Sequence, residues 1–389
     1  MDVADAAEGA GGGDTVHGSD GAGAPGAMSA DLFEVWEPGR PVPLAQILGA
    51  LRRGVGDPSM VIGERQLWWA VTTPLGPALT WWRSMPVRGG APVATPGAAR
   101  ADRPGLGGMA GCEPRTAAMP DGSARAERPD RVELRAYGPG AAWFQGRVPR
   151  ILGGDDDPSG FVARHDRVTA ALRQPHHRHW RAPRTGLVIT SLVPSILEQK
   201  VTGKQAFGGF RVLVRRYGTP IPTPAEVVRA AGPQAHAVAR MHAAPDARGW
   251  RRIPSWAWLQ AGVEPPQSRT IMRALDHADA LERTADLPHA EAHARLRSVP
   301  GLGVWTSAKV AQTAWGDADA PTFRDYHVAK QIGHALIGQD TDDAGMARLL
   351  EPYRGHRFRA ERLILAGGPP RPRHGARMTL PSHLPTRTW

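Results

Sequence analysis

Residues 296–330 read LRSVPGLGVWTSAKVAQTAWGDADAPTFRDYHVAK, and the architecture is best predicted from them. The pattern predicts a helix, a Val-Pro-Gly-Leu-Gly turn, a second helix, a loop, and an aspartate, Asp325, at the start of a third helix. Gly301 and Gly303 carry no Cβ, so the backbone can approach a ligand closely at this turn. The helix that begins at Val304 presents unpaired N–H groups, which bind anions. We therefore expect the turn to seat a phosphate group.

The charge of the chain is strongly positive. Its 389 residues carry a formal net charge of +11, and residues 1–30 hold five acidic and no basic residues, so the remainder carries +16 (11 plus 5). A basic globular part suits a polyanion partner such as DNA. Arginine so outnumbers the four lysines that codon bias accounts for part of this charge. The single cysteine, Cys112, excludes an intrachain disulfide, a thiolate zinc site and a four-cysteine iron–sulfur cluster.

The sequence predicts an α+β protein in which a small antiparallel sheet domain precedes a mainly helical bundle. No long apolar run and no signal peptide occur, so we expect a soluble cytoplasmic protein with no membrane segment. The predicted parts are a disordered acidic N-terminus at 1–30, an α+β domain at 31–150, a disordered Gly/Pro-rich insertion within it at 85–130, a helical region at 151–366 and an extended Pro/Arg-rich tail at 367–389.

Alternating and helical periodicities predict the individual elements. The predicted strands cover 66–71, 78–82 and 131–137, and the predicted helices cover 42–53, 160–171, 187–217, 223–231, 268–279, 289–297, 304–315, 326–337 and 342–353.

The glycine turn between two helices is followed by Asp325, 22 residues after Gly303 (325 minus 303). This arrangement resembles the helix-hairpin-helix and catalytic aspartate of the DNA glycosylase superfamily. The glycines alone are equally compatible with a plain turn between packed helices, and Asp325 favours the glycosylase interpretation. Further similarity, to the 3-methyladenine DNA glycosylase II (AlkA-type) group, lies in short motifs at 51–58, 137–141 and 353–357.

Asp325 is the candidate catalytic group. A buried carboxylate can stabilise the positive charge that develops on deoxyribose as the glycosidic bond breaks, and it can orient the attacking water. The same residue could serve only as the N-cap of the helix at 326–337. The two roles are compatible, because the helix dipole favours the ionised carboxylate. Two neighbouring acids, Asp317 and Asp319, are expected in a solvated loop and are given no role.

The resemblance assigns two residues to a base pocket. Trp305 stands where bifunctional members of the superfamily carry a Schiff-base lysine, which implies a monofunctional enzyme that uses water. Its ring also suits stacking on a flipped, cationic alkylated purine, although core packing is the commoner role of a tryptophan. Lys309, one turn further along, can reach the same pocket or lie in solvent, and its amine keeps lyase chemistry open.

Residues 190–206, TSLVPSILEQKVTGKQA, resemble the AlkA-type segment that fills the gap left by an extruded base. Gln199 matches the glutamine of that segment, whereas Lys200 stands where an apolar wedge is found. Lys200 and Lys204 are suited to phosphate contacts, unless they belong only to a polar helix face. With Gly301, Gly303 and Val304 they complete the predicted DNA-binding set.

The resemblance implies a monofunctional glycosylase that hydrolyses the N-glycosidic bond of damaged, alkylated purines in double-stranded DNA. It also implies a TATA-binding-protein-like sheet followed by helices, and a hairpin whose carbonyls can hold a monovalent cation. We expect no metal ion or other cofactor, a monomer, and association with the nucleoid through DNA. Two alternatives stay open: a glycosylase for oxidised or deaminated bases, and a helix-hairpin-helix protein that binds DNA without catalysis.

Overall fold

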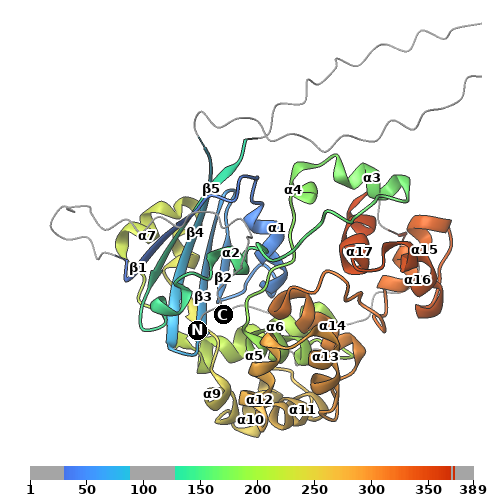
Figure 1. Ribbon diagram of the computed structural model, residues 1–389. Coiled ribbons are helices and arrows are strands. Elements are labelled where there is room, and N and C mark those ends of the chain that lie inside the picture. Colours follow the sequence, from blue (N-terminus) through green and yellow to red (C-terminus); the bar gives the residue numbers. More distant parts are fainter. Residues whose placement is uncertain (1–29, 88–127, 369–370, 373–389) are drawn as a thin grey trace, which may run out of the picture.

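The computed structural model describes residues 30–87, 128–368 and 371–372. In these residues a five-stranded antiparallel sheet is followed by many short helices, which confirms the predicted α+β class (Figure 1). The predicted disordered terminus, most of the predicted insertion and most of the predicted tail lie outside the described residues, as does Cys112.

The sheet has the strand order β1-β5-β4-β3-β2, and each neighbouring pair is antiparallel. β4 continues through Pro86, which pairs with Asp130, so ordered structure extends into both ends of the predicted insertion. The strands are β1 (Leu32–Trp36), β2 (Met60–Ile62), β3 (Gln66–Thr73), β4 (Gly76–Pro86) and β5 (Asp130–Tyr137).

Apolar side chains cover both faces of this sheet. Trp69 and Trp82 belong to the core on one face, and Trp68 and Trp81 belong to the core on the other. Successive side chains of a strand point to opposite faces, so the unbroken apolar runs of β3 and β4 fit a sheet that is buried on both sides. The covering helices are α1 (Leu44–Leu48) and α2 (Val148–Ile151) on the first face, and α7 (Ala225–Ala230) and α8 (Ala235–Val238) on the second (Figure 1).

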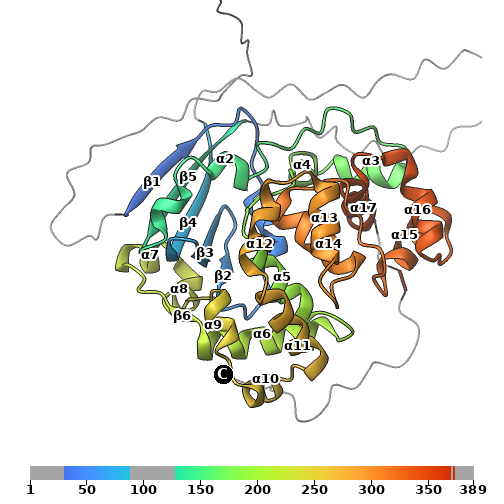
Figure 2. The same ribbon diagram turned by 60° about the horizontal axis from the view of Figure 1, so that its bottom comes forward.

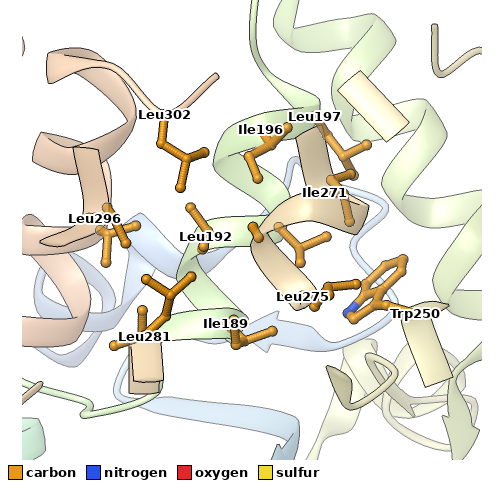
Figure 3. Close-up of a cluster of buried hydrophobic side chains, with 14 of the residues drawn as sticks. Ile189, Leu192, Ile196, Leu197, Trp250, Ile271, Leu275, Leu281, Leu296 and Leu302 are labelled. Atoms are coloured by element: carbon orange, nitrogen blue, oxygen red, sulfur yellow. The ribbon is translucent and has the colours of Figure 1, made fainter. Parts of the chain in front are cut away.

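A helical bundle packs beside the sheet around helix α5. The side chains of Ile189, Leu192 and Ile196 on α5 lie among those of the surrounding helices (Figure 3). A helix that is apolar on all sides is stable only when it is enclosed, which explains the central position of α5. The bundle contains α5 (Val188–Leu197), α6 (Gly203–Tyr217), α9 (Ala247–Arg251), α10 (Ser255–Gln260), α11 (Pro265–Leu275), α12 (Ala278–Glu282), α13 (His289–Arg297) and α14 (Val304–Val310).

A second helical cluster has its own core, which includes Ile332, Met346 and Ile364. It lies at one end of the molecule in both views (Figures 1 and 2). The loop from the bundle into this cluster carries Asp325, so that residue lies where the two helical cores meet. The cluster contains α3 (Asp166–Leu172), α15 (Val328–Ile337), α16 (Asp343–Leu350) and α17 (Arg357–Ala366).

The remaining regular elements are small. They are helix α4 (Pro175–Arg178), the two-stranded ribbon of β6 (Thr219–Pro220) and β7 (His242–Ala243), and 3-10 helices at Gly49–Leu51, Ala141–Phe144, Gly232–Gln234, Arg283–Asp286 and Glu351–Tyr353. Within the described parts of the chain, no helix combines the length and the apolar character needed to cross a membrane.

Several predicted helix boundaries are wrong, and local geometry explains the main one. The predicted helix at 187–217 is two helices, because Lys200 has a left-handed backbone (φ 57°) and the Thr202 hydroxyl caps α6 by accepting from Gln205 N–H. The helix at 289–297 has the predicted bounds. Other helices also differ from their predicted bounds. The helices predicted at 160–171 and 268–279 are α3, which begins at Asp166, and α11, which covers Pro265–Leu275. The helices predicted at 304–315, 326–337 and 342–353 are α14, which gives way to a π-helix at Ala311–Trp315, α15, which begins at Val328, and α16, which ends at Leu350.

Candidate active site

The predicted phosphate-binding turn joins α13 to α14. Gly301 has φ +98°, which residues with a side chain rarely adopt, and a Cβ there would lie 2.7 Å from Thr270 Oγ1 on α11. Gly303 is the N-cap of α14 with φ −94°, and a Cβ there would meet nothing within 4 Å. Glycine is therefore needed at 301 for conformation and packing, whereas at 303 it keeps an exposed stretch of backbone open.

Asp325 is held by three hydrogen bonds. Its Oδ1 accepts from the backbone N–H groups of His327 (2.8 Å) and Val328 (3.1 Å), and its Oδ2 accepts from the indole Nε1–H of Trp305 (3.0 Å). The carboxylate thus binds N–H groups at the start of a helix, but it is not the N-cap expected for a helix at 326–337, because α15 begins at Val328 and its N-cap is His327. It is only partly buried, so a ligand can still approach it.

Trp305 orients this carboxylate. The ring is partly buried on α14, and its N–H is committed to Asp325. A hydrogen bond from a neutral donor fixes the direction of a carboxylate and leaves its negative charge in place. The indole supplies no amine, so a covalent imine cannot form at this residue.

Gln199, which the resemblance places in the DNA-binding set, lies against the hairpin turn. Its Nε2–H groups donate to the Gly301 carbonyl (3.1 Å) and to Thr306 Oγ1 (2.8 Å). The segment that carries it is itself fixed, because Gln267 Nε2 on α11 donates to the carbonyls of Leu197 and Gln199 (2.9 Å each). The side-chain amide of Gln199 therefore supports the hairpin turn from the α5 side.

The three predicted lysines occupy different environments. Lys200, at the left-handed position between α5 and α6, and Lys204, in the first turn of α6, are both exposed. Lys309 is half-buried on α14, four residues after Trp305, and its charge acts on Glu361 of α17. Lys200 and Lys204 are exposed enough to meet a phosphate backbone, whereas Lys309 is partly enclosed on α14.

Glu361 is a buried acid of this region that the sequence did not reveal. Its carboxylate accepts from Thr322 N–H (2.7 Å) and from Thr322 Oγ1–H (2.6 Å). Gln312 Nε2 donates in turn to Thr322 Oγ1 (3.0 Å) and to the Ala320 carbonyl (2.9 Å). Burial raises the pKa of Glu361 to about 7, although the Thr322 hydrogen bonds and the charge of Lys309 favour the ionised form. Helical periodicity at α17 gave no signal, because it cannot tell which polar residue a neighbouring loop will cover.

The expectation that Asp317 and Asp319 lie in a solvated loop is wrong. Asp317 is buried and lies 3.3 Å from His293 Nε2, while Asp319 accepts from Arg357 Nε (2.8 Å) and from a terminal nitrogen of the same guanidinium (2.6 Å). Burial opposes ionisation of Asp317, but the hydrogen bond from His293 and the neighbouring His289 outweigh it and lower the pKa. Both acids anchor the loop that follows the π-helix, Asp317 to α13 and Asp319 to the start of α17.

A chain of hydrogen bonds through Ser307, His293 and Asp317 has the residue types of a hydrolytic triad. His293 Nδ1 lies 2.6 Å from Ser307 Oγ, and its Nε2 lies 3.3 Å from Asp317. Ser307 is fully buried, so no substrate reaches its hydroxyl. The chain instead ties α13 and α14 to the loop that leads to Asp325.

Comparison with known proteins finds similar folds among solved structures. No protein-family model matches the sequence, and no curated protein matches it either. Among solved structures, a 3-methyladenine DNA glycosylase from Archaeoglobus fulgidus is similar with a TM-score of 0.56 at 14% identity, over 86% of this chain and 96% of that one. An 8-oxoguanine glycosylase/lyase from Clostridium acetobutylicum, bound to double-stranded DNA, is similar with a TM-score of 0.54 at 10% identity, over 87% and 98%.

A third similar structure, of a protein named MBOgg1 in complex with a low-affinity DNA ligand, has a TM-score of 0.57 at 10% identity, over 88% of this chain and 97% of that one. The chain therefore has the fold of the DNA glycosylases, which confirms at the level of fold the resemblance seen in the sequence.

Proposed function

We propose that this protein is a monofunctional DNA glycosylase that hydrolyses the N-glycosidic bond of alkylated purines in double-stranded DNA. The observation that carries the proposal is the Asp325 carboxylate, which a helix start and the Trp305 indole fix beside a glycine hairpin on the glycosylase fold. A group that must stabilise a transition state has to be oriented before the substrate arrives.

The proposed reaction uses Asp325 in two ways. As the bond between base and deoxyribose lengthens, the sugar becomes oxocarbenium-like, and the carboxylate stabilises that positive charge. The same carboxylate orients the water that attacks the anomeric carbon. The products are a free base and an abasic site. Alkylation makes the base a cation and a good leaving group, so no residue needs to protonate it.

The preference for water over an amine nucleophile rests on Trp305. Its position corresponds, by resemblance, to the lysine of bifunctional enzymes, and an indole cannot form a Schiff base. Lys309 is the nearby amine, and its partial burial on α14 and the effect of its charge on Glu361 support a structural role for it. Borohydride trapping on abasic DNA tests this assignment: we expect no covalent adduct, and a trapped adduct that Lys309→Ala abolishes would make the enzyme a lyase.

Double-stranded DNA is the proposed partner, and we propose that a monomer binds it. The exposed Gly303 backbone, with Val304 at the helix start, would meet one strand, and Lys200 and Lys204 would contact phosphates beside it. A monovalent cation at the hairpin is part of the same proposal: the Gly301 carbonyl accepts one hydrogen bond, from Gln199, and a carbonyl oxygen has a second lone pair.

A second type of damaged base is also a candidate substrate. The similar structures include an 8-oxoguanine glycosylase/lyase as well as a 3-methyladenine glycosylase, so an oxidised purine is the second candidate substrate. Trp305 favours the alkylated base, because the face of an indole attracts a cation. Parallel assays on methylated duplex and on duplex with 8-oxoguanine opposite cytosine would decide between the two lesions.

The deciding experiment is excision from methylated duplex DNA by wild type, Asp325→Asn and Asp279→Asn. Asp279 is an exposed acid on α12, so its amide variant controls for the loss of one surface charge. We expect Asp325→Asn to lose at least about 100-fold in the rate of base release while it still binds DNA. Unchanged release in that variant would refute the mechanism, and the absence of release from any lesion by wild type would leave a DNA-binding protein without catalysis.

A further inference from the structure

Glu361 is a carboxylate that the proposed reaction does not use, although it is buried in the middle of α17 with an exposed fraction of 4%. Enclosing a carboxylate is costly unless hydrogen bonds or opposite charges compensate. In the described part of the chain, both hydrogen bonds that reach Glu361 come from Thr322. This cost suggests that the contact between α17 and Thr322 has a specific purpose.

Thr322 is held from two sides. Gln312, in the π-helix that follows α14, donates to its hydroxyl oxygen, and that hydroxyl donates onward to Glu361. Gln312 also binds the Ala320 carbonyl. The donors run in one direction, from Gln312 through Thr322 to Glu361, and hydrogen bonds in such a chain strengthen one another.

The segment held in this way leads directly to the proposed catalytic aspartate. Thr322 precedes Asp325 by three residues, and Asp325 must keep one oxygen on Trp305 of α14 and the other on the start of α15. These two helices belong to different cores. A small shift of one core relative to the other would break one of these contacts unless the segment between them is pinned.

We propose that Glu361 is a positioning residue that holds Asp325 in its reactive orientation through Thr322. This inference rests on the proposed glycosylase function. Catalysis of this kind is sensitive to displacements of an ångström or less, so the segment that carries the aspartate needs support from both cores. Glu361 supplies it from the C-terminal cluster and Gln312 supplies it from the bundle.

The charged groups around Glu361 come from three elements. The charge of Lys309 on α14 favours the ionised form of Glu361, the charge of Asp325 in the loop opposes it, and Arg362 is the neighbouring residue on α17. A neutral substitute at 361 therefore changes the electrostatics at Asp325 as well as its support, and the test has to separate these two effects.

The test uses Glu361→Gln, Thr322→Val and the double variant, with Glu351→Gln as the control. Glu351 is an exposed acid whose only described ion-pair partner is Arg354, so its variant should behave as wild type. We measure the single-turnover rate of base release, the Kd for duplex DNA that holds an abasic-site analogue, and backbone amide hydrogen exchange over residues 320–328.

A positioning role predicts a fall of at least about tenfold in the single-turnover rate for Glu361→Gln, with a Kd within about twofold of wild type. Exchange over 320–328 should rise while exchange in α5 stays the same. Because Glu361 acts through Thr322, the double variant should be no slower than the slower single variant, a non-additivity that marks coupled residues. If Glu361 acted by electrostatics alone, the rate losses of Glu361→Gln and Thr322→Val would add in the double variant.

Other outcomes overturn the proposal. A folded Glu361→Gln with unchanged rate and unchanged exchange would show that the contact positions nothing. A slower rate accompanied by weaker DNA binding and by faster exchange across the whole molecule would show a general stability effect. If wild type releases no base from any lesion, the glycosylase proposal fails, and local exchange over 320–328 alone then decides whether Glu361 pins the segment.

Discussion

Two neighbouring regions meet at Trp305: the hairpin turn at residues 299–303 and the aspartate segment at residues 320–328. The conformation of the hairpin turn is set mainly by the backbone, since Gly301 adopts a left-handed conformation and Leu302 N–H donates to the Val299 carbonyl. The aspartate segment is held mainly by side chains from distant elements. They belong to Gln312, Glu361, Trp305 and Asp343, and they add to the contacts of Asp325 with the start of α15.

The difference teaches that the proposed binding turn and the proposed catalytic group are specified differently in this molecule. The left-handed conformation of Gly301 is local, because glycine adopts it readily, although Gln199, 102 positions away, also binds the Gly301 carbonyl. The aspartate segment depends more heavily on distant side chains, as in the contact between Thr322 and Glu361, which are 39 positions apart. The turn should therefore fail through single-residue changes in conformation, and the aspartate segment through loss of long-range contacts.

The largest expected effect is a pH dependence of stability that arises from Glu361, which binds the aspartate segment. The pKa of Glu361 is about 7 in the folded protein and 4.5 as its ordinary value, so between these pH values the unfolded chain loses a proton that the folded chain keeps. Stability therefore falls as the pH rises from 4.5 to 7, by about 3 kcal/mol at most. Urea unfolding of wild type and Glu361→Gln from pH 5 to 8 should show a steeper fall of stability in wild type. Burial also raises the pKa of Glu282 and of Asp57, and their contribution is common to both proteins.

Asp317 provides an internal check on that result. Its pKa is lowered, so its contribution to stability is present above its ordinary value of 3.8 and is lost as the pH falls through the folded value. The two acids thus act in opposite directions and in different ranges. A slope above pH 5 that is equal in wild type and in Glu361→Gln would contradict the assignment.

The second effect concerns the hairpin turn. Gly301→Ala should lower the free energy of unfolding by about 2 kcal/mol, because φ +98° is strained for alanine and the new Cβ approaches Thr270. Gly303→Ala should change stability by less than about 0.5 kcal/mol, since its φ is ordinary and the space around it is open. Equal losses at the two glycines would mean that the turn is not specified by local conformation.

The third effect separates the indole N–H of Trp305 from its ring. Trp305→Phe keeps an aromatic side chain but removes the donor to Asp325, so base release should slow about tenfold, which corresponds to one hydrogen bond to a charged group. The Kd for abasic-analogue DNA should stay the same. Trp256→Phe, at an exposed tryptophan on α10, is the matched control. Full activity in Trp305→Phe would remove the indole from the positioning network.

The smallest expected effect concerns the charges beside the turn. Lys200→Ala and Lys204→Ala should each weaken DNA binding severalfold and reduce the slope of log K against log salt by about 0.9. Arg229→Ala, at an exposed arginine on α7 behind the sheet, should leave the slope unchanged. An equal change of slope in all three variants would contradict the proposal that DNA contacts the face that carries Lys200 and Lys204.

Much of this arrangement could be predicted from sequence because it depends on local patterns. The helix at 289–297, the glycine turn and the place of Asp325 at a helix start follow from periodicity, φ preference and capping. The break within 187–217 was missed because a lysine at a left-handed position gives no compositional signal. The burial of Asp317 was missed because its partners, His289 and His293, lie on a helix more than 20 residues earlier.

By itself the sequence determined the α+β class and the glycine turn, and it singled out the residue that we propose for the chemistry, because each of these inferences rests on local patterns of residues. Only the tertiary structure decided how Asp325 is held: Trp305 reaches it across a 20-residue separation, and Glu361 supports its segment from the last helix. The physical reason is that a side-chain hydrogen bond depends on where two elements pack, and packing follows from the whole core rather than from either residue.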